Sequence, residues 1–135
     1  MVKEITPIQA DELLKQEKNA VLVDVRSSME YEFVGHPIKA VHLPLKEPPD
    51  WETDLGFVDK LRSKLKKELS ENPDRPLLML CRSGVRSGLA AEMLIKEGFS
   101  NVYNVLEGFE GDKDDEGHRN TINGWRFHNL PWEQS

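Results

Sequence analysis

Hydrophobic residues along the chain form short continuous runs, and they also recur at helical spacing in longer segments. The runs at 20–25 and 77–80 are too apolar for strands with a solvent-facing side, and they suit parallel strands covered on both faces. Shorter runs at 40–43 and 101–105 predict two more strands. Because the 77–80 run is the most apolar of these, we place it at the centre of the sheet.

Helices are predicted between these runs. The first begins at Thr6, which can cap it, with Pro7 at the first helical position and Gln9 placed to reach back to the cap. The other predicted helices span residues 29–33, 57–69 and 85–97. Strands that alternate with helices predict an α/β fold with a mostly parallel sheet.

Length, charge and cysteine content narrow the class of protein. The chain has 135 residues, which suits one domain over 1–135, with a polar insert at 107–124. A net charge of −6 argues against nucleic-acid binding, and there is neither a polybasic patch nor an apolar run long enough for a membrane. The N-terminus lacks the apolar core of a signal peptide, and a single cysteine forms no internal disulfide. We therefore expect a reducing, cytoplasmic setting.

The segment LMLCRSGVRSG, residues 78–88, places the only cysteine, Cys81, between the central strand and a helix. Sites in parallel α/β sheets form at the carboxyl ends of strands. Gly84 and Gly88 let the backbone bend and approach a ligand, and successive amides can form an anion-binding nest. Arg82, Arg86 and the helix N-terminus add positive charge, which favours a nucleophilic thiolate. The alternative is a buried structural cysteine, which the two arginines and the glycine-rich turn argue against.

The loop CRSGVRS resembles the active-site loop Cys-x-x-Gly-x-Arg of the rhodanese family of sulfurtransferases. The other similar segments are VLVDVR with Glu30 and Gly35-His36 near the N-terminus, and Asn104-Val105, Gly108-Phe109, Gly124-Trp125 and Leu130-Pro131-Trp132 near the C-terminus. The resemblance covers nearly the whole chain. It implies a three-layer fold with a central sheet of about five strands and helices on both faces.

The resemblance also implies a double-displacement reaction. Cys81 would take a sulfane sulfur from a small anionic donor such as thiosulfate, and would pass it from a persulfide to cyanide or a thiol. A thioredoxin-like or sulfur-carrier protein is a further possible acceptor. Arg86, with Arg82 second to it, would bind the donor, and neither a metal nor an organic cofactor is implied. The backbone N–H groups expected to cradle the persulfide are those of Arg82, Ser83, Gly84, Val85, Arg86 and Ser87.

Several residues have a structural and a functional interpretation. Asp24 and Arg26 follow a strand at the same sheet edge as Cys81, and we prefer a pair that fixes the loop over a donor-binding role. His36 is interpreted as a structural hydrogen-bonding residue, and Ser87 as a helix cap. Ser83 is left open between capping and anion binding.

The sequence departs from the family pattern at two places. Lys39-Ala40 stands where a glycine usually precedes the alanine, and the stretch GDKDDEGHRNTING, residues 111–124, is longer than in many such domains. We favour a bare surface loop for this insert over a lip above the site. Its residues 112–117 resemble the start of a calcium loop, but Asn123 stands where a bidentate glutamate is expected.

Two other functions compete with sulfur transfer. A cysteine-dependent phosphatase or arsenate-type enzyme needs Cys-x-x-x-x-x-Arg, whereas Arg86 comes one position too early and Leu80 stands where that signature has histidine. A non-catalytic binding module usually lacks the cysteine, which is present here. A dithiol redox reaction within one chain is excluded because there is no resolving cysteine.

Overall fold

A five-stranded parallel sheet in the order β1-β6-β5-β2-β4 forms the centre of the computed structural model, which describes residues 1–134. Its strands are β1 (Lys3–Ile5), β2 (Val21–Asp24), β4 (Val41–His42), β5 (Leu77–Leu80) and β6 (Val102–Val105). Every neighbouring pair is parallel. All four residues of β5 are buried, and its position between β6 and β2 confirms the central strand predicted from its apolar run.

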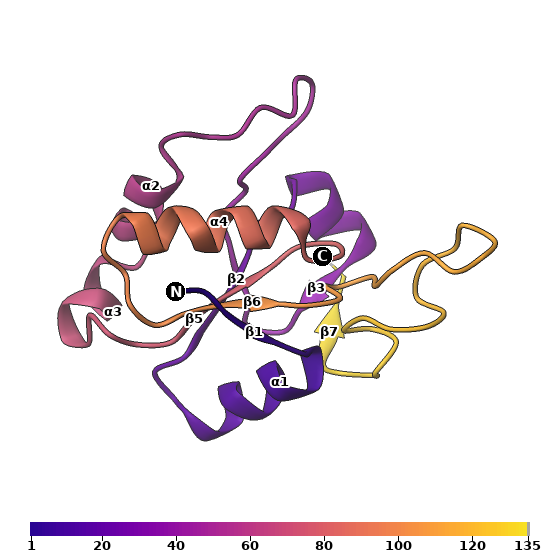
Figure 1. Cartoon of the computed structure of the whole chain (residues 1–135), viewed down its shortest axis with the longest axis horizontal. Helices are drawn as coiled ribbons and strands as arrows, with labels where there is room; N and C mark the ends of the chain where they lie inside the picture. The colour runs from indigo at the N-terminus through magenta and orange to yellow at the C-terminus, as the bar shows by residue number, and fades with distance from the viewer. Residues whose placement is uncertain (135) are drawn as a thin grey trace.

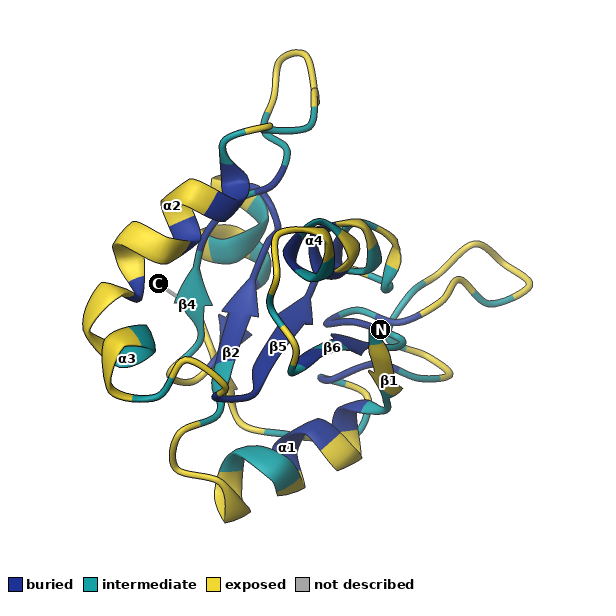
Figure 2. Ribbon diagram, turned by 60° about the vertical axis from the view of Figure 1, so that its left-hand side comes forward, coloured by how far each residue is buried: buried dark blue, intermediate teal, exposed yellow. Residues whose placement is uncertain are grey.

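Helices cover both faces of the sheet, so the predicted three-layer α/β fold is confirmed (Figure 1). Alternate residues of each strand point to opposite faces. Val23 and Met79 therefore pack under one layer, whereas Leu78 and Leu80 pack under the other. The first layer contains α2 (Phe57–Lys64), α3 (Lys66–Glu71) and α4 (Val85–Lys96), and the second contains α1 (Pro7–Gln16). Figure 2 shows β2, β5 and β6 buried between these helices, whose outer surfaces are exposed.

Local signals set several helix boundaries. The Thr6 hydroxyl accepts from the Gln9 amide at 3.2 Å, and the Gln9 side chain accepts from the Thr6 amide at 2.9 Å, as predicted. The single helix expected over 57–69 instead divides at Leu65, whose backbone leaves the helical region (φ −106°, ψ 25°) while its side chain stays in the core. The short helix expected near 29–33 is the π-helix η1 (Glu30–Val34).

The C-terminal segment completes the layer that contains α1. Trp125 is 2% exposed in the same apolar cluster as Leu78, and its indole N–H donates to the Pro131 carbonyl at 3.0 Å. Further on, β7 (Trp132–Glu133) pairs antiparallel with β3 (His36–Pro37). This two-stranded sheet, which the sequence did not predict, attaches the end of the chain to the segment after η1.

The stretch that resembles a calcium loop folds around one of its own carboxylates. Asp114 accepts hydrogen bonds from the amides of Glu116 and His118, both at 2.9 Å, and from the Thr121 hydroxyl at 2.7 Å. The Asp114 carboxylate is therefore a structural hydrogen-bond acceptor within its own turn.

Within residues 1–134, none of the helices combines the length and the apolar character needed to span a membrane.

Candidate active site

Cys81 lies at the carboxyl edge of the central strand, immediately after β5 and before α4. Gly84 has φ 108°, a left-handed conformation that turns the loop into the helix and favours glycine. Its amide donates to Cys81 Sγ at 3.1 Å. The first-turn amides of α4 have no acceptor within the helix, so they are available to a ligand at this end of it. The thiol is 1% exposed, so it lies beneath the loop and not at its surface.

Ser87 links the thiol to β6. Its hydroxyl donates to Asn104 Oδ1 at 2.6 Å, and its oxygen lies 3.2 Å from Cys81 Sγ. Asn104 in turn donates to the Gly84 carbonyl at 3.1 Å. A hydroxyl has one hydrogen, so Ser87 accepts from the thiol while it donates to Asn104, and it must rotate to donate to a thiolate. Our interpretation of Ser87 as a helix cap was wrong, because Gly84 is the cap residue and Ser87 lies within α4.

Arg86 is held by Glu30 on η1. Its two terminal nitrogens donate to the two carboxylate oxygens at 2.7 and 2.9 Å. Burial by itself would raise the pKa of Glu30, but the hydrogen bond and charge of Arg86 outweigh it and lower that pKa from 4.5 to about 2. Glu30 in return raises the pKa of Arg86. Arg86, which we expected to bind the donor, therefore has a carboxylate partner within the protein, because η1 folds directly beside the loop.

A cleft of about 680 Å³ opens beside this ion pair. Arg82 is exposed in it, and within residues 1–134 its side chain has neither an ion-pair nor a hydrogen-bond partner. Met29 and Trp51 contribute apolar surface to the walls. The segment 107–124 contributes Glu110 and Arg119. We had interpreted the stretch 111–124 as a bare surface loop, and this interpretation is corrected at Arg119, which forms part of a wall of the cleft.

Asp24 and Arg26 form the loop-fixing pair that we preferred. Both side chains are fully buried, and the guanidinium lies 2.6 Å from the carboxylate. Arg26 also donates to the Gly35 carbonyl at 2.6 Å and lies 4.4 Å over the Phe109 ring. Neither residue lines the cleft. His36 is likewise structural, since its Nδ1 lies 2.9 Å from the Tyr31 carbonyl oxygen and its ring stacks on Tyr31.

Backbone hydrogen bonds hold the chain after β6 against residues 81–87, the cysteine loop, and we call this contact the clamp. The Phe109 amide donates to the Cys81 carbonyl at 2.8 Å, and the Glu110 amide donates to the Arg82 carbonyl at 3.0 Å. Gly108 permits this approach, because a Cβ atom there would lie 2.5 Å from the Arg82 carbonyl. The loop is thus fixed from β5, from α4 and from the segment that begins the insert.

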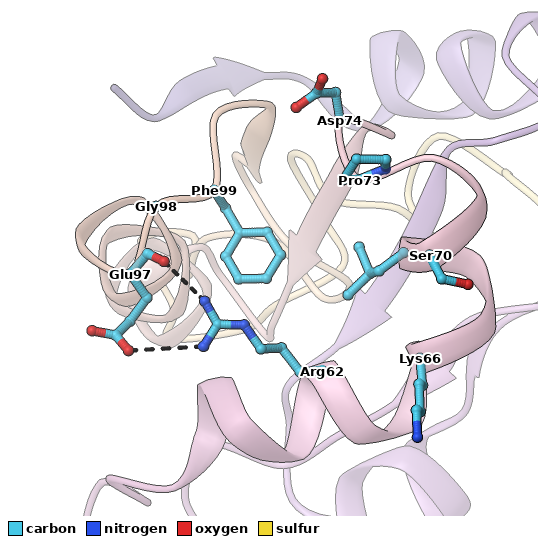
Figure 3. A pocket seen from close by; sticks show the side chains of 9 residues that line it. Arg62, Lys66, Ser70, Pro73, Asp74, Glu97, Gly98 and Phe99 are labelled. Atoms are coloured by element: carbon cyan, nitrogen blue, oxygen red, sulfur yellow. Dashed lines mark hydrogen bonds and ion pairs between the residues drawn. The ribbon is translucent and has the colours of Figure 1, made fainter.

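A second pocket, of about 410 Å³, lies near the other end of α4 (Figure 3). Arg62 lies 5.0 Å over the Phe99 ring and donates to the Glu97 carbonyl at 2.9 Å. These contacts join α2 to the turn after α4. The pocket contains no cysteine and lies away from the Cys81 loop, so we assign its arginine a packing role.

Comparison with known proteins gives a consistent picture. The Rhodanese-like domain family matches residues 6–115. A thiosulfate sulfurtransferase, GlpE of Haemophilus influenzae, is 35% identical over 109 residues, which cover 81% of this chain and 86% of that protein. An uncharacterized protein of Rickettsia rickettsii is 34% identical over 98% of both chains. The crystal structure of Rv0390 from M. tuberculosis superposes with a TM-score of 0.81 at 41% identity, over 99% of this chain and 98% of that one. The chain therefore belongs to the rhodanese-like domain family.

Proposed function

We propose that the chain is a sulfurtransferase that carries a sulfane sulfur as a persulfide on Cys81. The observation that supports this proposal best is the surroundings of the thiol. Its sulfur accepts the Gly84 amide at 3.1 Å at the N-terminal end of α4, and an arginine with no protein partner within residues 1–134 stands next to it in sequence. An amide that donates to a sulfur stabilises its anionic form, and an unpaired guanidinium in the same loop attracts an anionic donor.

In the first half-reaction the Cys81 thiolate attacks the outer sulfur of thiosulfate. A new sulfur–sulfur bond forms on the protein, and the donor's own sulfur–sulfur bond breaks, with its electron pair leaving on sulfite. We assign recognition of the donor to Arg82, because Arg86 is already paired with Glu30. The amides of the loop then surround the terminal sulfur of the persulfide, which bears the negative charge.

In the second half-reaction a nucleophile attacks that terminal sulfur and regenerates the thiolate. Cyanide would leave as thiocyanate, and a thiolate acceptor would leave as a persulfide. The same step serves a small thiol or the thiol of a thioredoxin-like or sulfur-carrier protein. No external oxidant or reductant enters either step, which suits a single cysteine working in a reducing cytoplasm.

The test is mass spectrometry of the protein after incubation with thiosulfate. We expect Cys81 to gain one sulfur atom, cyanide to remove it, and the Cys81→Ser variant to gain none. Arg82→Gln should lower kcat/KM for thiosulfate about tenfold, the loss of one charge-assisted contact at an exposed position, with unchanged thermal unfolding. Sustained hydrolysis of an aryl phosphate, together with no sulfur on Cys81, would instead favour the phosphatase alternative.

A further inference from the structure

Arginines from two separate parts of the chain meet at the cleft. Arg82 and Arg86 belong to the cysteine loop, whereas Arg119 belongs to the insert and lies beyond residues 6–115, the part that matches the family. Arg86 is paired with Glu30. Arg82 and Arg119 are the other two cations that line the cleft. The insert thus adds a positive charge to a site that already holds one for a small donor.

The position of Arg119 is fixed relative to the loop. Its Nη1 donates to the Gly111 carbonyl at 2.6 Å, and the Gly111 amide donates to the Arg82 carbonyl at 3.2 Å. One residue therefore bridges the arginine and the loop. The next residue, Asn120, donates its amide to the Glu110 carbonyl at 2.7 Å. Because its other guanidinium nitrogens have no protein partner within residues 1–134, Arg119 has donors left for a ligand.

The cleft is larger than the proposed donor needs. Pockets of about 300–1,000 Å³ hold whole drug-sized ligands, and this cleft measures about 680 Å³. Its walls include Met29 and Trp51, which are 61% and 46% exposed. A small inorganic anion beside Arg82 would leave that apolar surface and Arg119 unused. The cleft suits a longer molecule with an organic body and an anionic group.

The acidic residues of the cleft do not outnumber its arginines. Glu30 is bound on both carboxylate oxygens by Arg86. Glu110 is the other carboxylate that lines the cleft, so three arginines face two carboxylates and the lining keeps a net positive charge. Arg119 is therefore placed to bind an anion of the ligand.

We propose that Arg119 is a specificity-determining residue that binds the carboxylate of a small organic thiol, the sulfur acceptor. This inference rests on the proposed function. The acceptor's thiol loses its proton to solvent, and the thiolate attacks the terminal sulfur of the Cys81 persulfide. A bond forms between the acceptor and that sulfur, and the bond to Cys81 breaks with its electron pair returning to Cys81. Arg119 contacts the carboxylate and takes no part in bond breaking.

The experiment compares three acceptors of the persulfide: glutathione, which carries carboxylates; cysteamine, which carries an amine and no carboxylate; and cyanide. Arg119→Gln should lower kcat/KM for glutathione about tenfold and leave cysteamine and cyanide within about twofold. Arg119→Lys should retain part of the glutathione preference, because it keeps the charge. Lys113→Gln removes a cation from an exposed position of the same insert and should change none of the three rates.

The persulfide is first quantified by mass spectrometry in each variant, so that the two proposals fail separately. Wild-type protein without a persulfide would refute the proposed function, and this inference with it. A persulfide that forms normally, with glutathione turnover unchanged in Arg119→Gln, would overturn the role of Arg119 alone. An equal loss with all three acceptors would also overturn it, because Arg119 would then serve only to order the insert.

Discussion

Glu30 and Arg86 lie 56 residues apart in the sequence, yet each gives the other its main polar contact. Their side chains are 17% and 16% exposed, so solvent screens the pair only in part. The ion pair fixes the arginine of the cysteine loop against η1, where Ser27 also donates to Glu30 at 2.9 Å. Of the two arginines in the loop, Arg82 is therefore the one whose side chain has no partner within residues 1–134, which is why we propose it as the donor-binding residue.

Replacement of Glu30 by Gln should destabilise the protein in a pH-dependent manner. Because the pKa of Glu30 is lowered from 4.5 to about 2, its contribution is fully present above pH 4.5 and is lost as the pH falls toward 2. At neutral pH we expect a loss of about 1–3 kcal/mol in the free energy of unfolding. Urea unfolding at several pH values measures it, and the difference between the two proteins should shrink across that window.

Glu32→Gln is the matched control, because Glu32 is exposed on the same π-helix. It should change stability by less than about 0.5 kcal/mol at any of these pH values. A stability difference for Glu30→Gln that stayed constant from neutral pH down to pH 2 would contradict the assignment of the lowered pKa.

Single-residue roles were predictable from the sequence only where the partners are close along the chain. Asp24 and Arg26 are two positions apart, and their pairing was expected and found. The partner of Arg86 was not predicted, since nothing local indicates that η1 packs on the loop. We predicted Ser87 as the helix cap because serine is common at that position. The cap residue is instead Gly84, three positions earlier, where the chain turns into α4.

Among the elements, the backbone clamp between Gly108 and the cysteine loop decides where that loop lies. Gly108 has φ 67°, and a Cβ atom there would lie 2.5 Å from the Arg82 carbonyl and 2.6 Å from that of Cys81. Both contacts are to backbone, which has little freedom to move. Any side chain at 108 must push the start of the insert away from the loop.

Gly108→Ala and Gly117→Ala form a matched pair that tests this clamp. Both glycines have positive φ, but a Cβ atom at Gly117 would meet no atom within 4 Å. Gly117→Ala should cost about 1 kcal/mol from backbone strain alone. Gly108→Ala should cost roughly 2 kcal/mol more and should slow persulfide formation, as measured by urea unfolding and mass spectrometry. Equal effects of the two substitutions would show that the clamp is unimportant.

The elements themselves were predicted to different degrees, for a physical reason. The buried strands β2 and β5 are easily predicted from the sequence, because strands covered on both faces must be apolar throughout. The strand β1 at the sheet edge and the two-residue strands β3 and β7 are short and partly polar, so their sequences resemble loops. The break at Leu65 was missed because the apolar spacing continues through it.

At the scale of the whole molecule, the family match and the folded unit do not end at the same place. The match ends at residue 115, but one of the two apolar clusters is completed by Trp125. That cluster also contains Leu78 and Leu80 of the central strand and Phe109 of the clamp. The segment after the insert therefore stabilises the sheet and, through Phe109, holds the cysteine loop.

Two tryptophans of opposite burial test this dependence. Trp125→Ala should destabilise the protein by about 3–5 kcal/mol, because it leaves a cavity beside the central strand. Trp51→Ala removes the same volume from a side chain that is 46% exposed, and it should cost less than about 1 kcal/mol. Chemical denaturation measures both, and persulfide formation at 25 °C should be impaired in Trp125→Ala alone, since only that cavity loosens the packing around Phe109. If Trp125→Ala proved as stable as Trp51→Ala, the segment after residue 115 would not contribute to the stability of the domain, and this claim would be wrong.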